Sequence, residues 1–126
     1  MSDEAPAVVG IAVLVVDCAD PPMLAEWWQR LLGGAVEVDA EGDAFLRREG
    51  GLAMDFLRVP EPKTGKNRLH LDLGTTDLAR ATEQVAALGA TRADDVHAGG
   101  SWQVLRDPEG NEFCLLAPGV PSVSGP

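Results

Sequence analysis

The sequence predicts an α+β fold built from two tandem copies of a βαβββ unit. Each half holds a strand, a capped helix, a glycine stop and short strands joined by a glycine turn. The two expected helices, 20–33 and 77–89, differ in length by only one residue. Because 126 residues fit one domain, we expect a single domain with modules at 8–59 and 68–118, a linker at 60–67 and a loose tail at 119–126.

The first module begins with an apolar, valine-rich run over residues 8–16, which predicts a strand buried on both faces. Asp20 can cap the helix that follows, and Pro21-Pro22 fits its first turn. An amphipathic stripe at i, i+3, i+4 and i+7 indicates which helix face is buried. Its members are Leu24, Trp27, Trp28 and Leu31. One tryptophan of the adjacent pair is expected to face the sheet, and the other an edge or an interface.

Shorter extended segments complete the first module at 36–38, 44–48 and 52–59. Residues 60–67 read Pro-Glu-Pro-Lys-Thr-Gly-Lys-Asn, a composition typical of a linker. We therefore expect the first module to end at 59.

The second module restarts the pattern with an alternating strand over 68–73. Alternation places leucines 69, 71 and 73 on one face and Arg68, His70 and Asp72 on the other. A second amphipathic helix over 77–89 follows, and then strands at 101–106 and 112–116. The segment 107–111, Asp-Pro-Glu-Gly-Asn, has the composition of a tight turn between those last strands.

Composition narrows the possible partners and the compartment. The formal net charge is −10, and an acidic chain repels nucleic acid but attracts cationic small molecules. The longest apolar run is too short to cross a bilayer, and the first residues do not resemble a signal peptide. Two cysteines are too few for a disulfide framework. We expect a cytoplasmic protein that binds neither nucleic acid nor membrane.

Several motifs resemble the vicinal oxygen chelate superfamily, which includes glyoxalase I, bleomycin-resistance proteins and extradiol dioxygenases. They are Asp-Cys-Ala-Asp-Pro at 17–21, the helix end at 27–33, Leu-His-Leu-Asp-Leu at 69–73 and the segment 107–113. The likeness covers nearly all of 8–118 and is greatest to a glyoxalase-like bacterial branch. It implies two βαβββ modules whose paired curved sheets enclose a cavity, with the helices outside, and it implies a homodimer.

The resemblance also implies a metal site with His or Glu ligands from the first and last strands of each module. His70 matches one ligand position, whereas Gly10 or Ile11 and Cys114 stand at two others. At the fourth, the register leaves open whether Asp55 or Phe56 points inward. We expect no bound metal. The alternative is a divalent ion (Zn, Ni, Fe or Mn) held by His70, Asp55 and Cys114.

The predicted ligand pocket is edged by polar and aromatic side chains of the second module: His70, Asp72, Trp102, Glu112 and Cys114. His70 and Asp72 either form a structural hydrogen bond or make His70 a general base, the one catalytic candidate. Trp102 can stack on a flat or cationic ligand. Arg47 and Arg106 occupy equivalent places in the repeat, where each could pair with a carboxylate such as Asp55 or Asp107, or bind an anion.

These observations favour metal-independent binding of a small organic molecule. The alternative is a metal-dependent lyase, isomerase or dioxygenase centred on His70, and a third possibility is a scaffold without chemistry. Glyoxalase I activity itself is not expected, because its chemistry needs a Lewis acid.

Overall fold

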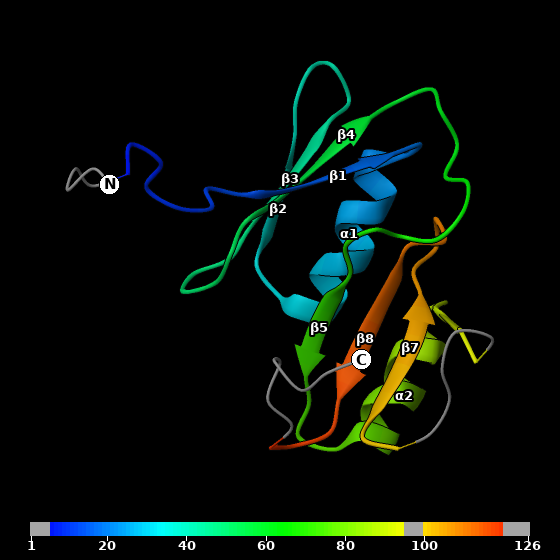
Figure 1. Cartoon of the computed structure of the whole chain (residues 1–126). Helices are drawn as coiled ribbons and strands as arrows, with labels where there is room; N and C mark the ends of the chain where they lie inside the picture. Colours follow the sequence, from blue (N-terminus) through cyan, green and yellow to red (C-terminus); the bar gives the residue numbers. More distant parts are fainter. Residues whose placement is uncertain (1–5, 95–99, 120–126) are drawn as a thin grey trace. The chain divides into compact units, whose positions relative to one another are not determined.

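The computed structural model describes residues 6–94 and 100–119, which form two units spanning 1–59 and 60–126 (Figure 1). Each unit contains one helix and one four-stranded mixed sheet, as expected for an α+β fold with a repeated βαβββ module. The predicted tail, apart from Gly119, lies outside the described residues. Within the described part, neither helix has the length and hydrophobicity needed to cross a bilayer.

The first unit contains one helix between its first and second strands. Its elements are β1 (Leu14–Cys18), α1 (Pro21–Leu32), β2 (Ala35–Val38), β3 (Ala44–Arg47) and β4 (Met54–Arg58). The strand order is β1-β4-β3-β2, with β1 parallel to β4 and the other pairs antiparallel. This order is that of a βαβ crossover followed by a meander.

Helix α1 begins and ends where the sequence predicts. The Asp20 side chain accepts a hydrogen bond from the Met23 backbone N–H at 3.2 Å, and proline occupies the first turn. Gly34 lies so close to β3 that a Cβ atom there would be 2.4 Å from the Arg47 carbonyl oxygen. Both Trp27 and Trp28 are buried and meet edge to face at 5.4 Å. The expectation that one would lie at an edge or interface is therefore wrong.

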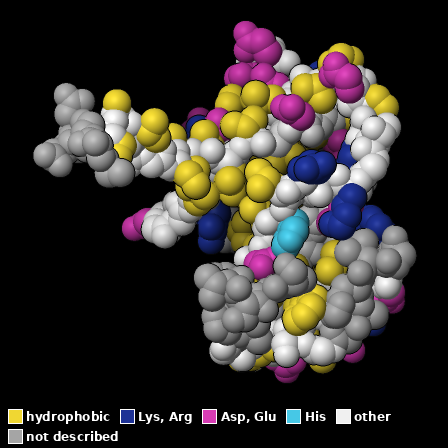
Figure 2. Space-filling view, in the orientation of Figure 1, with side chains coloured by type: hydrophobic (Ala, Val, Ile, Leu, Met, Phe, Trp, Pro, Cys, Tyr) yellow, Lys and Arg dark blue, Asp and Glu magenta, His cyan; other side chains and the backbone are white. Residues whose placement is uncertain are grey.

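The start of the first strand also differs from the prediction. Strand β1 begins at Leu14, and residues 6–13 form neither helix nor strand. Val8 and Val9 are 81% and 100% exposed, and hydrophobic side chains are visible along this N-terminal segment in Figure 2. Val15 on β1 is half exposed, so this strand is not buried on both faces.

The second unit repeats this arrangement. Its elements are β5 (Leu71–Gly74), α2 (Leu78–Ala87), β6 (Thr91–Arg92), β7 (Trp102–Arg106) and β8 (Glu112–Leu116), in the sheet order β5-β8-β7-β6. The predicted turn at 107–111 is confirmed: Asp107 Oδ1 accepts from the backbone N–H groups of Glu109 and Asn111. The two-residue strand β6 was not predicted.

The registers show which positions of the two units are equivalent. Leu14 and Leu71 each precede a capping aspartate by six residues. They lie opposite Met54 and Phe113, respectively, on the neighbouring parallel strand. One residue before each of these leucines stand Val13 and His70. By this register the residue of the first unit equivalent to His70 is Val13, rather than the predicted Gly10 or Ile11.

The two faces of the second sheet differ in character. Toward α2, which packs on β7 and β8, lie fully buried apolar residues such as Leu105 and Phe113. By alternation, Val104 and Cys114 point to the opposite face. There they form a buried cluster that contains no α2 residue: Ala93, Val104, Cys114 and Leu116, with Trp102 packed against it. This opposite face is where the sequence predicts a ligand pocket.

Candidate functional site

The candidate site is the face of the second sheet that points away from α2. Asp72 on β5 lies opposite Cys114 on β8, which lies opposite Val104 on β7. Two further pairs on the same strands place side chains on this face: Trp102 with Leu116, and Arg106 with Glu112. Opposed residues of adjacent strands point to the same side of a sheet. The structure therefore brings the predicted pocket residues of this unit to one surface.

His70 and Asp72 form the predicted pair. His70 Nδ1 lies 3.1 Å from Asp72 Oδ1, and the two side chains are 34% and 15% exposed. An ionised carboxylate can only accept, so Nδ1–H is the donor in that state. Nε2 is then the nitrogen that can accept a proton or a hydrogen bond from a ligand. The geometry fits either a structural hydrogen bond or an oriented general base.

Cys114 is a buried thiol at the centre of this face. It is 2% exposed, and its Sγ donates to the Leu115 carbonyl at 3.6 Å. Burial, followed by the negative charge of Asp72, raises the pKa of Cys114 to about 12, although a backbone hydrogen bond from Gln103 acts in the opposite direction. The thiol is therefore protonated at neutral pH and has neither the charge nor the exposure of a reactive cysteine.

Glu112 is a buried carboxylate at the polar end of the face. It is 4% exposed and accepts from the Asn67 backbone N–H at 2.8 Å and from Lys63 Nζ at 3.3 Å. Arg106 Nε and Lys66 Nζ lie 3.7 and 3.8 Å away. Burial alone would raise the pKa of Glu112, but these hydrogen bonds and the lysine charges lower it below its ordinary value. The Glu112 carboxylate therefore contacts groups of the protein itself and is not directed toward a ligand.

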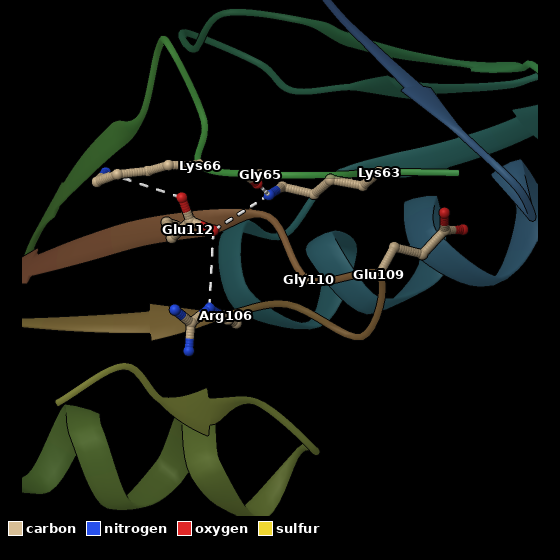
Figure 3. Close-up of a pocket in the computed structure, with 7 residues that line it drawn as sticks. All are labelled: Lys63, Gly65, Lys66, Arg106, Glu109, Gly110 and Glu112. Carbon is tan, nitrogen blue, oxygen red and sulfur yellow. Dashed lines mark hydrogen bonds and ion pairs between the residues drawn. The ribbon is translucent and has the colours of Figure 1, made fainter. Parts of the chain in front are cut away.

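An open cavity of about 390 Å³ adjoins Glu112 (Figure 3). It is lined by Lys63, Gly65, Lys66, Arg106, Glu109, Gly110 and Glu112. The segment 60–67, predicted only as a linker, supplies Lys63 and Lys66 to this lining, and neither lysine was a predicted site residue. One signal was available, because three of the ten Lys and Arg residues of this acidic chain fall within 63–68.

Asp55 lies in the first unit, at the position equivalent to Cys114. Phe56 is fully buried toward α1, so Asp55 points to the opposite face, which resolves the ambiguous register. Arg47 Nη1 contacts Asp55 Oδ1 at 2.7 Å, and the same guanidinium lies 5.4 Å from the centre of the Phe45 ring. The predicted pairing of Arg47 with a carboxylate is confirmed. Arg106 contacts Glu112, a pairing that was not predicted from the sequence.

Comparison with known proteins decides the family. The sequence matches the family described as "Glyoxalase-like domain" over residues 13–116. This chain belongs to that family. No curated protein matches the sequence.

Solved structures share the fold of this glyoxalase-like domain at low sequence identity. A fosfomycin resistance protein, FosX, from Listeria monocytogenes, complexed with Mn(II) and sulfate, has a TM-score of 0.69 and 14% identity, covering 87% of this chain and 90% of that one. A glyoxalase/bleomycin resistance protein/dioxygenase family enzyme from Burkholderia phytofirmans PsJN gives 0.66 and 16%, with coverage of 82% and 94%. A possible glyoxalase from Bacillus cereus gives 0.65 and 14%, with coverage of 87% and 100%. These likenesses extend to the fold alone.

The residues at the metal-ligand positions implied by the superfamily resemblance do not fit a metal. The Val13 side chain has no atom that could ligate, and Asp55 is paired with Arg47. The Cys114 thiol is buried in an apolar cluster with Ala93, Val104 and Leu116. His70 alone keeps ordinary ligand chemistry. Among the residues described, no three His, Cys, Asp or Glu side chains are grouped so that they could hold a metal ion.

Proposed function

We propose that this glyoxalase-like domain binds a small organic molecule without a metal, on the face of the second unit that carries His70, Asp72, Trp102 and Cys114. One observation carries the proposal: a hydrogen-bonding pair, an aromatic ring and an apolar floor share one sheet face. Ligand sites typically combine apolar walls with a few convergent polar groups.

Each of these groups has a distinct role in the proposed site. Trp102 offers a ring for stacking, and the buried cluster around Cys114 packs against this ring and supports it. His70, oriented by Asp72, supplies a hydrogen bond or accepts a proton through Nε2. Asp72 adds negative charge to this end of the face, which favours a ligand that carries a donor or a positive charge.

Metal independence is supported by the identity of the side chains at the ligand positions. Of the four positions implied by the superfamily resemblance, one is valine, one carries a carboxylate paired with arginine, and one carries a thiol buried in an apolar cluster.

A thermal-shift screen of the full chain against metabolites and antibiotics, with EDTA and with divalent ions, tests the proposal. We expect at least one compound to raise the Tm of the unchanged protein by several degrees in EDTA. The same compound should not raise the Tm of His70→Ala. Arg80→Ala, an exposed change on α2, should keep it. A shift that requires added metal, or a tightly held divalent ion in protein purified without chelator, would contradict metal independence.

A second candidate function is a metal-dependent lyase, isomerase or dioxygenase centred on His70. The 3.1 Å contact from Asp72 favours it, because histidine ligands usually donate their other N–H to a carboxylate. In that case His70→Ala abolishes both metal content and turnover. Asp72→Asn should then weaken metal affinity by roughly 10- to 100-fold. Unchanged turnover in His70→Ala would remove this candidate.

We further propose that the protein is a cytoplasmic homodimer, as the superfamily resemblance implies. Exposed apolar side chains in the first unit, including Ile11 and Val15, support a partner surface. Light scattering should then give twice the 13.3 kDa chain mass. A monomer at the same concentration would contradict the dimer.

A further inference from the structure

Three basic side chains surround a single buried carboxylate in the second unit. Lys63 and Arg106 both approach Glu112 Oε2, at 3.3 and 3.7 Å, and Lys66 approaches Oε1 at 3.8 Å. Because they share one carboxylate, the three positive charges lie close to one another. All of them line the cavity of about 390 Å³ (Figure 3).

The charges of the side chains that line this cavity do not balance. Three positive side chains line it, against the two carboxylates of Glu109 and Glu112. Glu109, the other acidic side chain of the lining, directs its carboxylate away from the cluster in Figure 3. The cavity wall is therefore positive in a chain whose net charge is −10. Like charges held close together repel, and an anion placed among them removes that repulsion.

Space for an anion is available beside the cations. Gly65 and Gly110 contribute backbone without side chains to the lining. A Cβ atom built at Gly65 would meet no atom within 4 Å, and one at Gly110 would meet only Lys63 Cδ, at 3.9 Å. A cavity of this size lies within the range of small-molecule sites.

We propose that this cavity binds an oxyanion: a phosphate, sulfate or carboxylate, either free or as a group on an organic molecule. The two lysines act as point charges and Arg106 as a directional donor. Glu112 is a positioning residue that holds the cations together before the anion enters. The proposal does not depend on the organic-ligand site at His70 and Trp102, because different side chains carry it.

An NMR titration of the ¹⁵N-labelled full chain with inorganic phosphate, at ionic strength held constant with chloride, tests the site. We expect saturable shifts of the Gly65, Lys66 and Gly110 amide signals. Lys66 is 57% exposed and makes the longest of the three contacts, so Lys66→Gln should fold and bind phosphate roughly three- to tenfold more weakly. Lys66→Arg should retain binding, and the control Arg80→Gln should match the unchanged protein.

A parallel titration with phenyl phosphate identifies the source of the anion. Tighter binding than inorganic phosphate supports an oxyanion group on an organic ligand, and equal affinity supports a free anion. Equal shifts in chloride, an absence of shifts at the cavity amides, or equal weakening by Arg80→Gln and Lys66→Gln would each overturn the proposal. Failure of the Tm screen would leave this result unaffected, so the two proposals fail separately.

Discussion

The two units have the same strand order, but their faces opposite the helix differ. In the first unit Arg47 forms an ion pair with Asp55 on that face. In the second unit the position equivalent to Asp55 is the protonated thiol Cys114, and Arg106 instead contacts Glu112. This comparison distinguishes positions whose residues the fold requires from positions where functional side chains can vary.

The helix-facing positions are apolar in both units. Leu46 and Leu105 are fully buried, and their cross-strand partners, Met54 and Phe113, are 2% and 1% exposed. These positions bury each sheet against its helix, so both units need apolar residues there. The opposite face has no such requirement, and its residues differ between the units.

The two equivalent arginines illustrate the change. Arg106 lies directly opposite Glu112 on β8. The residue of the first unit equivalent to Glu112 is Ala53, so Arg47 reaches diagonally to Asp55 instead. The acid has moved along the strand by two residues between the units. Asp55 pairs with an arginine that is 52% exposed, whereas Glu112 is buried among three cations.

The largest expected change in stability comes from substitutions on the two opposite faces of β8. Phe113→Ala should lower the free energy of unfolding by about 3–5 kcal/mol, because it empties the helix-facing core. Cys114→Ala, one residue along the same strand, should lower it by only about 1 kcal/mol because it removes one sulfur atom. Urea denaturation of both variants measures the difference. Equal losses would mean that the two faces contribute equally to the fold.

Local signals in the sequence predicted most of the fold. The Asp20 cap and the turn at 107–111 are specified by residues adjacent in the chain, and they were predicted correctly. The extent of β1 and the presence of β6 depend on pairing with distant strands. An apolar run such as 8–16 does not reveal how much of it has a partner.

For the candidate site too, features set by residues close in the sequence could be predicted, and features set by distant residues could not. Alternation along single strands predicted that Asp72 and Cys114 share their faces with His70 and Glu112, respectively. The cavity lined by Lys63, Lys66 and Arg106 could not be predicted from the sequence. It depends on a contact between Asn67 and Glu112, which are 45 residues apart in the chain. The net charge of −10 does not describe this cavity, because Lys63, Lys66 and Arg106 all line it.

A smaller effect should distinguish the two carboxylates. Glu112→Gln should lower the free energy of unfolding by about 2–3 kcal/mol, because it replaces a buried carboxylate and leaves three clustered cations without their shared counter-charge. Asp55→Asn should lower it by about 0.5–1 kcal/mol, since its partner is exposed to solvent. Chemical denaturation at pH 7 measures both. A larger loss in Asp55→Asn would reverse the proposed order of the two ion pairs.

The ion pairs of Glu112 should also make the stability of the protein depend on pH. The pKa of Glu112 is lowered from its ordinary value of 4.5, so the folded state binds the proton less readily than the unfolded state. Its stabilisation is present above pH 4.5 and is lost as pH falls through the lower folded value. The gap in stability between the unchanged protein and Glu112→Gln should therefore narrow below pH 4.5. A constant gap at every pH below 4.5 would contradict the shifted pKa.

The smallest effect concerns the thiol that replaces the Asp55 carboxylate in the second unit. The pKa of Cys114 is raised from 9.0 to about 12, by burial first and then by the charge of Asp72. Asp72→Asn should therefore lower this pKa and speed alkylation of Cys114 at a fixed alkaline pH. Cys18 is also free and buried, so Cys18→Ala is the background for the measurement.

Asp55→Asn is the matched control, since it removes a carboxylate from the first unit and should leave the alkylation rate of Cys114 unchanged. The raised pKa also sets the sign of a stability change. The unfolded thiol ionises near pH 9 while the folded thiol stays protonated, so stability falls as pH rises from 9 toward 12. Asp72→Asn should reduce that fall. If alkylation of Cys114 is no faster in Asp72→Asn than in Asp55→Asn, burial alone keeps the thiol protonated.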